Sequence, residues 1–340
     1  MSYSASFNHQ LFHFKLPSGT SRGVLTEKHS WFIKVWETSN PDLIGIGECS
    51  VIKGLSPDFL NQETYEKKLS DVIRNLDQNL DEWPSIKFGV EMALNQLKNK
   101  ESRLSFKNSF YSNEQRIPIN GLIWMGEISF MRQQIEDKIA QGFSTIKLKI
   151  GAIDFDKEIQ LLSEIRSKYS KKEIELRVDA NGAFTNENAL QRLKQLHQLE
   201  IHSIEQPIPP GDWIAMQKLC KDSPLPIALD EELIGINNRS EKIKLLETIN
   251  PQFIILKPSL HGAFSGCDEW IQLAEARNIE WWITSALESN IGLEAICQFT
   301  ANYHNTKPQG LGTGGLYIDN IPSNLKIKDG RIFLAKNERE

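Results

Sequence analysis

The chain contains the stretch Thr145-Ile-Lys147-Leu-Lys149, a short apolar run that ends on a lysine, and similar runs follow it as far as Ser289. The later runs end on a carboxylate, a lysine or a hydroxyl, and they are Glu175-Leu-Arg177-Val-Asp179, Ile201-His-Ser-Ile-Glu205, Pro226-Ile-Ala-Leu-Asp230, Phe253-Ile-Ile-Leu-Lys257 and Trp281-Trp-Ile-Thr-Ser285. Consecutive run ends are 25 to 30 residues apart. A strand, a helix and the two loops that join them need about this length of chain.

Two further segments extend the spacing on either side. Arg116-Ile-Pro-Ile-Asn120 precedes the first run and Leu311-Gly312 follows the last one at a similar interval. Between the run ends, apolar residues recur at the spacing of one helix face, at 128–141, 155–169, 186–199, 213–220, 239–248, 266–276 and 293–303. Eight such repeats predict a parallel (β/α) barrel. Barrel active sites lie at the carboxyl ends of the strands, so the polar run ends are candidate site residues.

Three of the run ends are the carboxylates Asp179, Glu205 and Asp230. Because neighbouring barrel strands lie side by side, we expect these carboxylates to meet at one mouth of the barrel. Unpaired carboxylates so close together repel one another, and a hard divalent cation removes the conflict. Mg²⁺ takes oxygen ligands and keeps positions open for water or substrate, so the pattern predicts a Mg²⁺ site, with Mn²⁺ as the alternative ion.

Three lysines flank the predicted metal site. Lys147 and Lys149 are two residues apart and therefore share a strand face, and Lys257 lies across the mouth. Like charges and a nearby cation lower the pKa of an ammonium group, which makes a lysine a usable general base. A metal with a lysine pair fits abstraction of a proton α to a carboxylate, with the metal stabilising the enediolate.

The polar motifs occur in a fixed order, which is Lys147-Leu-Lys149, Asp179-Ala-Asn181, Glu205-Gln-Pro207, Asp230-Glu231 and Lys257. In this order they resemble the muconate-lactonizing-like branch of the enolase superfamily, a superfamily in which a lysine base acts with Mg²⁺. A second set resembles, within that branch, the o-succinylbenzoate synthases of menaquinone synthesis: Gly47-Glu48-Cys49, Arg177, Ser285-Ala-Leu-Glu288-Ser289 and Gly312-Thr-Gly314. The resemblance covers essentially the whole chain.

The resemblance implies a modified barrel of the (β/α)7β type, in 116–316, with an α+β capping domain in 1–115 to which 317–340 returns. The sequence itself predicts three antiparallel strands near 12–14, 31–36 and 43–48, and a helix at 87–97. It also predicts a polar loop at 16–23 and a hairpin at 325–334 around Asp329-Gly330. Two segments, 19–23 and 49–55, are candidate lids over the barrel mouth.

The resemblance also implies an activity, the metal-dependent dehydration of 2-succinyl-6-hydroxy-2,4-cyclohexadiene-1-carboxylate to 2-succinylbenzoate. This hydro-lyase reaction begins with abstraction of the α-proton and passes through an enediolate. Lys149 is the expected base, Lys257 the cation on the opposite face, and Lys147 a third lysine of the catalytic group. The remaining implied positions are Arg177, Ser285, Gly312 and Gly314 as substrate contacts, and Asn181 and Glu231 as supports of the metal ligands and lysines.

Other interpretations of these motifs stay open. Arg177 could equally be a core-facing ion partner, and the segment after Ser285 could equally cap the next helix. An N-acylamino acid racemase or a dipeptide epimerase is the alternative function, in which Lys149 and Lys257 act from opposite faces. Gly312-Thr-Gly314, where dipeptide epimerases carry an Asp-x-Asp pair, argues against the epimerase. A non-catalytic binding protein is disfavoured because all three carboxylates and both lysines are present.

Composition argues against several other classes of protein. The 340 residues carry a net charge of −5 with a pI near 5.9, which gives no electrostatic case for binding nucleic acid or an anionic membrane. No apolar stretch of about 20 residues predicts a membrane span, and the N-terminus lacks the pattern of a signal peptide. The scattered cysteines, at 49, 220, 267 and 297, are expected to be free thiols in a reducing cytoplasm. We expect a small-molecule carboxylate as the partner, and the sequence is compatible with an oligomer.

Overall fold

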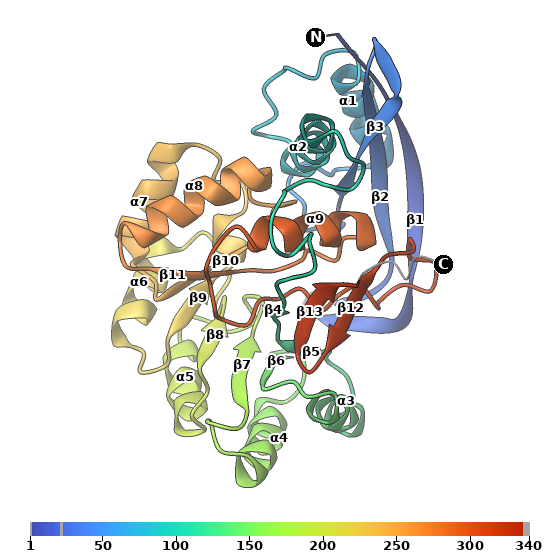
Figure 1. The fold of residues 1–340 in the computed structure, drawn as a ribbon. Coiled ribbons are helices and arrows are strands. Elements are labelled where there is room, and N and C mark those ends of the chain that lie inside the picture. The colour runs from blue at the N-terminus through green and yellow to red at the C-terminus, as the bar shows by residue number, and fades with distance from the viewer. Residues whose placement is uncertain (1, 21–22, 336–340) are drawn as a thin grey trace.

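A computed structural model describes residues 2–20 and 23–335 of the chain. Its strands form three sheets: an antiparallel sheet near the N-terminus, a curled seven-stranded parallel sheet, and a small three-stranded sheet that contains the C-terminal hairpin (Figure 1). No helix in the described ranges is both long and apolar enough to cross a bilayer.

The N-terminal sheet consists of β1 (Tyr3–Thr20), β2 (Gly23–Glu37) and β3 (Asn40–Ser50), in the order β1-β2-β3. Helices α1 (Gln62–Val72) and α2 (Pro84–Asn99) cover one face of it (Figure 1). Alternate side chains of β2, such as Trp31, Ile33 and Val35, are fully buried and pack in one core with residues of both helices. Gly47 of β3 lies so close to α2 that a Cβ there would stand 1.8 Å from the Gly89 carbonyl oxygen. The predicted three strands and the helix at 87–97 are therefore confirmed.

The polar segment 16–23 was predicted to be a loop, but its described residues belong to strands β1 and β2. Residues up to Thr20 continue β1, and β2 begins at Gly23, because the strands keep pairing at Ser18 with Leu25 and at Thr20 with Gly23 after a register shift. The middle of the candidate lid at 19–23, residues 21 and 22, lies outside the described residues.

The parallel sheet and the helices that alternate with it follow the predicted repeats. Its strands are β5 (Gly121–Ile123), β6 (Thr145–Lys149), β7 (Glu175–Asp179), β8 (Ser203–Glu205), β9 (Ile227–Leu229), β10 (Phe253–Leu256) and β11 (Glu280–Ile283). The helices are α3 (Ile128–Ala140), α4 (Phe155–Lys168), α5 (Ala189–Gln198), α6 (Trp213–Asp222), α7 (Arg239–Ile249), α8 (Ala263–Glu275) and α9 (Asn290–Thr300), with a 3-10 turn at Glu231–Leu233. Side-chain caps begin four of them, from Asp154, Asp212, Asn238 and Ser289.

Residues Gln309 and Gly310 close the barrel between β11 and the first strand. Gln309 forms a parallel bridge with Ile119, and Gly310 forms one with Thr284. The backbone N–H of Gly310 donates to Ile283 O at 2.8 Å, and the N–H of Gln309 donates to Pro118 O at 2.8 Å. The eighth strand is thus reduced to two bridging residues, which agrees with the expected modified barrel.

The first barrel strand begins later than the sequence predicted. The run 116–120 was expected to be that strand, but β4 (Ile117–Pro118) pairs with the C-terminal hairpin, and β5 starts only at Gly121. The C-terminal hairpin is β12 (Leu325–Lys328) and β13 (Arg331–Leu334), turning at Asp329-Gly330, where both φ angles are positive as a tight hairpin requires.

The segment before the hairpin contacts the N-terminal sheet. Tyr317 forms an antiparallel bridge with Phe14, and the N–H of Ile318 donates to His13 O at 3.0 Å. The division into a capping domain and a barrel domain at 115/116 stays a prediction. Residues 336–340 of the predicted tail lie outside the described residues.

Candidate active site

The strand register brings the predicted charged residues to one end of the parallel sheet. Lys149 lies opposite Asp179 across β6 and β7, and Asp179 lies opposite Glu205 across β7 and β8. Asp230 directly follows β9, and Lys257 directly follows β10. Because all seven strands run parallel, these side chains gather at the carboxyl end of the barrel, where the spacing predicted them.

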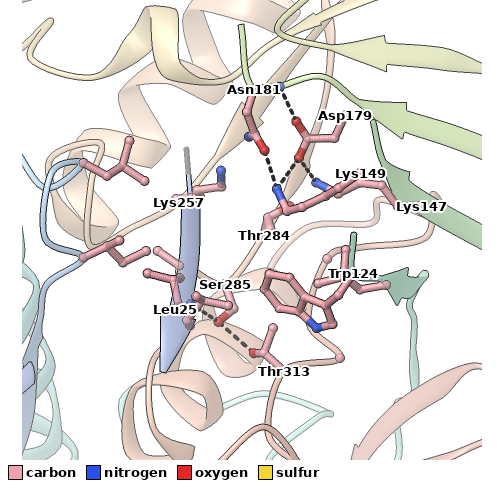
Figure 2. Close-up of a pocket in the computed structure, with 18 of the residues that line it drawn as sticks. Leu25, Trp124, Lys147, Lys149, Asp179, Asn181, Lys257, Thr284, Ser285 and Thr313 are labelled. Carbon is pink, nitrogen blue, oxygen red and sulfur yellow. Dashed lines mark hydrogen bonds and ion pairs between the residues drawn. The ribbon is translucent and has the colours of Figure 1, made fainter. Parts of the chain in front are cut away.

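A cavity of about 290 Å³ opens at this end of the barrel. Its polar end is formed by Lys147, Lys149, Asp179, Asn181 and Lys257, and Lys257 approaches from the side opposite to the other two lysines (Figure 2). Its other walls are mostly apolar and come from 23–25 of β2, from 52–55 and from the barrel loops. An apolar cavity with a few convergent polar groups is typical of a small-molecule site.

Lys147 and Lys149 bind carboxylates on neighbouring strands. The Nζ atom of Lys147 lies 2.6 Å from Glu205 Oε2 and 3.1 Å from Asp179 Oδ2. The Nζ atom of Lys149 lies 2.9 Å from the same Asp179 Oδ2 and 2.8 Å from Asn181 Oδ1. Asp179 is therefore shared by two ammonium groups, while its Oδ1 accepts a hydrogen bond from the N–H of Asn181 at 3.0 Å.

Lys257 completes the group from the other side. Its ammonium contacts Asp230 Oδ2 and lies 3.8 Å from Glu205 Oε1. Each of the three carboxylates thus contacts at least one lysine, whereas the sequence analysis considered only a metal ion as their partner. Buried charges need partners, and lysines at the strand ends of the same sheet supply them, although Lys147 reaches past β7 to Glu205.

These ion pairs set the pKa values of the group. Burial would raise the pKa of Asp179, but Lys147 and Lys149 outweigh burial and hold it well below its usual range. Burial would lower the pKa of Lys147, but the adjacent carboxylates outweigh burial and raise it. The pKa of Lys257 is likewise raised, since Asp230 and its neighbours outweigh burial. Both shifts run opposite to the predicted lowering, which assumed a metal ion beside the lysines.

The buried oxygens of the group bear on its fit to a metal ion. Glu205 Oε1 and Asp230 Oδ1 have no hydrogen-bond partner within the described ranges, and all candidate ligands are carboxylates, which suits a hard divalent cation. However, no three acidic, histidine or cysteine side chains of the described chain adopt a metal-binding arrangement. The ammonium of Lys147 lies between Asp179 and Glu205, within 3.1 Å of both. The chemistry of the donors, which are carboxylates with unpartnered buried oxygens, fits a hard divalent metal.

The comparison with known proteins identifies the family. The family model described as Enolase C-terminal domain-like matches residues 130–337. The chain belongs to the enolase superfamily. An o-succinylbenzoate synthase of Desulfotalea psychrophila (strain LSv54) is 48% identical over 95% of this chain and 96% of that protein.

Solved structures of the enolase superfamily share the fold. The crystal structure of MenC from Desulfotalea psychrophila LSv54 matches with a TM-score of 0.86 and 43% identity, over 98% of this chain and 100% of that chain. A dipeptide epimerase from Cytophaga hutchinsonii, solved with Mg and the dipeptide D-Ala-L-Val, matches with a TM-score of 0.79 and 18% identity, over 98% of this chain and 94% of that chain. At that identity, the second match shows the fold alone.

Two of the superfamily motif residues support the lysine and carboxylate group from behind. The side-chain amide of Asn181 donates to Glu231 Oε1 at 2.9 Å while its oxygen accepts from Lys149. Asn181 has a φ of 44° in the turn after β7, a left-handed conformation that asparagine adopts more readily than most residues. Lys149, Asn181 and Glu231 therefore form one hydrogen-bonded chain, as the sequence predicted for supporting residues.

Two further supporting residues were not assigned a role from the sequence. Gln206 is fully buried, its amide donates to Glu232 Oε2 at 3.0 Å, and its oxygen accepts from the N–H of Asp230 at 3.2 Å, so it joins the ends of β8 and β9. His261 accepts a hydrogen bond from the N–H of Lys257 at 2.9 Å. In the sequence, Gln206 could have been noticed as the middle residue of the motif Glu205-Gln-Pro207. His261 could have been noticed because it lies four residues after Lys257.

Ser285 and Gly312 both line the cavity, as expected of substrate contacts. The Ser285 hydroxyl donates to Glu288 Oε2 at 2.6 Å and accepts from Thr313 Oγ1 at 2.8 Å (Figure 2). The cap of α9 is Ser289 rather than Ser285. Within this segment, Ser285 therefore lines the cavity and Ser289 caps α9.

Arg177 and Gly314 are not brought to the cavity lining of the described chain. Arg177 is buried and donates to Glu175 Oε1 at 2.8 Å and to Pro308 O at 2.9 Å. Its guanidinium also lies 4.5 Å from the ring centroid of Trp282, which agrees with the interpretation of a core ion partner. The carbonyl of Gly314 accepts from the Asn320 side chain at 2.8 Å.

The apolar walls of the cavity could not be assigned from the sequence. Leu25, Ile52 and Leu55 come from the N-terminal segments, whereas Trp124 follows β5. The candidate lid at 49–55 was a partial signal, and 52–55 do line the cavity. Nothing in the local pattern marked Trp124.

Proposed function

We propose that this protein is an o-succinylbenzoate synthase, which dehydrates 2-succinyl-6-hydroxy-2,4-cyclohexadiene-1-carboxylate to 2-succinylbenzoate. The observation that carries the proposal is a full-length relationship, at 48% identity, to a protein named o-succinylbenzoate synthase. The cavity supports it, because Lys149 can act as the base for abstraction of an α-proton while Lys257 faces the substrate from the opposite side (Figure 2). A small-molecule carboxylate is the proposed partner, and a cytoplasmic location stays a prediction.

In the proposed reaction Lys149 is the base. Its Nζ reaches the cavity from the end of β6, and its contacts with Asp179 and Asn181 hold the side chain in one orientation. Lys149 would remove the α-proton and return a proton to the departing hydroxyl on the same face. Lys257 would act as the cation on the opposite side of the cavity, next to Asp230, and would stabilise negative charge that develops on the ring. Lys147 would hold Asp179 and Glu205 in place.

The proposal includes a divalent metal, which membership of the superfamily implies, and we propose Mg²⁺ with Asp179, Glu205 and Asp230 as its ligands. When bound, the ion would supply positive charge at the substrate carboxylate. Asn181, Glu231 and the buried Gln206 would keep these carboxylates oriented through the hydrogen bonds described above.

The alternative is a racemase or epimerase, because Lys149 and Lys257 lie on opposite sides of the cavity (Figure 2). A two-base reaction would require both lysines to exchange protons with substrate. The dipeptide version is less favoured, since no acidic side chain stands at Gly312 or Gly314 to bind a substrate ammonium.

The test is turnover of the cyclohexadiene carboxylate by purified protein, followed by loss of diene absorbance, with Mg²⁺ and after treatment with EDTA. We expect turnover that EDTA abolishes and Mg²⁺ restores. No turnover by folded, metal-supplemented protein would refute the function.

Variants test the roles of the two lysines. Lys149→Ala should lower kcat by a factor on the order of 10³, as loss of a general base does. Lys218→Ala, an exposed lysine on α6, is the control and should leave turnover unchanged. A loss of less than tenfold in Lys149→Ala would contradict its role as the base. Solvent deuterium appearing at the α-carbon of an N-acylamino acid in wild type, but not in Lys257→Ala, would instead favour the racemase.

A further inference from the structure

We propose that Lys53 forms a second anion subsite in the cavity, which binds the distal carboxylate of the substrate's succinyl chain. This inference rests on the proposed function, because the proposed substrate carries two carboxylates, one on the ring and one at the end of a flexible chain. The lysine and carboxylate group at the carboxyl end of the barrel accounts for the ring carboxylate alone. The second carboxylate needs a partner elsewhere in the cavity.

The charges that line the cavity single out Lys53. Four lysines line it in the part of the chain that the structure describes, and Lys147, Lys149 and Lys257 are engaged with barrel carboxylates. Lys53 forms no ion pair within residues 2–20 and 23–335. Among the described residues, the one acidic side chain of the lining is Asp179, which belongs to the lysine and carboxylate group at the barrel end. Within the part of the chain that the structure describes, Lys53 is therefore the lining cation that can take a new anion without breaking an existing pair.

The backbone around Lys53 is held in a fixed turn. The N–H of Leu55 donates to Ile52 O at 3.0 Å, and the N–H of Ile52 donates to the hydroxyl of Ser56 at 2.8 Å. Gly54 takes a φ of +78° at the tip of this turn. Ile52 and Leu55 flank Lys53 and also line the cavity. Because the turn is formed by the chain itself, binding of an anion to Lys53 carries little cost for ordering the loop.

The remaining walls explain why a charge is needed there. The lining also includes the apolar side chains of Val24, Leu25 and Leu287. A carboxylate that rested on these side chains would lose hydration without gaining a partner, which is costly. Lys53 is exposed, and an exposed lysine can bind a carboxylate at low desolvation cost. The cavity is therefore expected to favour substrates whose flexible side chain ends in a carboxylate that can reach Lys53.

The test compares two ligands that differ only in the distal group. They are 2-succinylbenzoate and 2-butyrylbenzoate, which carries a methyl group in place of the distal carboxylate. Lys53→Met removes the charge and keeps the length of the side chain, and Lys53→Arg retains the charge. Lys67→Met, an exposed lysine on α1, is the matched control. Binding is measured by calorimetry on each purified, metal-supplemented variant, and KM and kcat are measured with the cyclohexadiene carboxylate.

Lys53→Met should weaken binding of 2-succinylbenzoate by about 5- to 20-fold, the value of one charge-assisted contact, and leave 2-butyrylbenzoate within about twofold. KM should rise by a similar factor with kcat nearly unchanged, while Lys53→Arg and Lys67→Met should bind like wild type. The inference is overturned if wild type turns substrate over but Lys53→Met binds both ligands normally, or weakens both equally. A wild type that neither turns over the substrate nor binds 2-succinylbenzoate refutes the proposed function, and this inference with it.

Discussion

Replacement of Glu48 by glutamine should destabilise the protein and weaken substrate binding. Glu48, near the end of β3, is fully buried and reaches across to the start of α9. Its Oε1 accepts from Ser30 Oγ at 2.8 Å and from the N–H of Ser289 at 2.9 Å. Its Oε2 accepts from Ser289 Oγ at 2.6 Å and from the N–H of Gly292 at 2.9 Å. One carboxylate thus ties the N-terminal sheet to the helix that follows the cavity-lining segment.

The magnitude follows from these four donors. The hydroxyls of Ser30 and Ser289 can rotate to accept from an amide, but the backbone N–H groups of Ser289 and Gly292 cannot. Whichever way the introduced amide turns, one backbone N–H faces an N–H₂ group and loses its partner, at a cost of about 1–3 kcal/mol. Loss of the negative charge at the N-terminus of α9 adds about 0.5–1 kcal/mol. We therefore expect Glu48→Gln to lower the free energy of unfolding by about 1.5–4 kcal/mol.

The assay is equilibrium unfolding in urea, followed by tryptophan fluorescence, together with KM for the substrate. KM should rise severalfold, because Ser285 and Leu287, which precede α9, line the cavity. Glu294→Gln is the matched control: it is a buried glutamate of α9 that accepts from Ser323 Oγ at 3.2 Å, lies 3.8 Å from the Arg103 guanidinium and bonds to no backbone N–H in the described chain. An amide keeps an oxygen to accept from both partners, so the control should change stability by less than about 1 kcal/mol, the value of a half-exposed ion pair. Equal stability losses in the two variants would refute the reasoning.

Two further predictions concern the barrel itself. A Cβ at Gly310 would lie 2.4 Å from Thr284 Oγ1, so Gly310→Ala should force β11 and the closing residues apart and lower the free energy of unfolding by about 1–3 kcal/mol. KM should also rise, because the N–H of Ser285, which lines the cavity, donates to Gly310 O. Gly315→Ala, where a Cβ meets nothing within 4 Å, is its control, and urea unfolding that gives the same stability for both would contradict the prediction. Burial raises the pKa of Glu158 to about 7 from 4.5, although a hydrogen bond from the N–H of Gly151 at 2.7 Å opposes the shift. Because the folded state binds this proton more tightly, the contribution of Glu158 to stability is full below pH 4.5 and is lost as the pH rises through about 7. Between about pH 5 and about pH 8, wild type should therefore lose roughly 2–3 kcal/mol relative to Glu158→Gln, measured by urea unfolding at both pH values. A Glu158→Gln slope equal to that of wild type would count against the burial argument.

The barrel could be predicted from the sequence because each strand and its end are marked by residues that are neighbours in the chain. An apolar run that stops at a charged residue, such as 175–179 or 226–230, marks both the strand and the end that faces the site. Parallel register then brings Lys149, Asp179 and Glu205 together without knowledge of any distant contact. The helices between the strands were equally local, since each has one apolar face and several have a capping residue.

The features that the sequence did not predict depend on long-range contacts or on the direction of a side chain. Arg177 has the right strand face for the cavity, yet its long side chain turns to Glu175 and Pro308. The closing strand at Gln309 and Gly310 is too short to show any period. The pairing of lysines with carboxylates was also not predicted. The sequence places both kinds of residue at strand ends, and this pattern is the same whether the carboxylates bind the lysines or a metal ion.

The strand pairings of residues 309–334 bear on how the chain reaches its native state during synthesis. Gln309 and Gly310 close the barrel, Tyr317 pairs with β1, and β13 pairs with β4, so late residues complete three structures begun by early ones. A ribosome that adds about 5–20 residues per second needs roughly 20 to 70 seconds for a chain of this length. For roughly half of that time, from the synthesis of β5 to that of Gln309, the outer edge of β5 has no closing partner, and β11 shares this state once it has been made. Unpaired strand edges are aggregation-prone, so the interval before residues 309–334 leave the exit tunnel is the one in which the nascent chain is most exposed to misassembly.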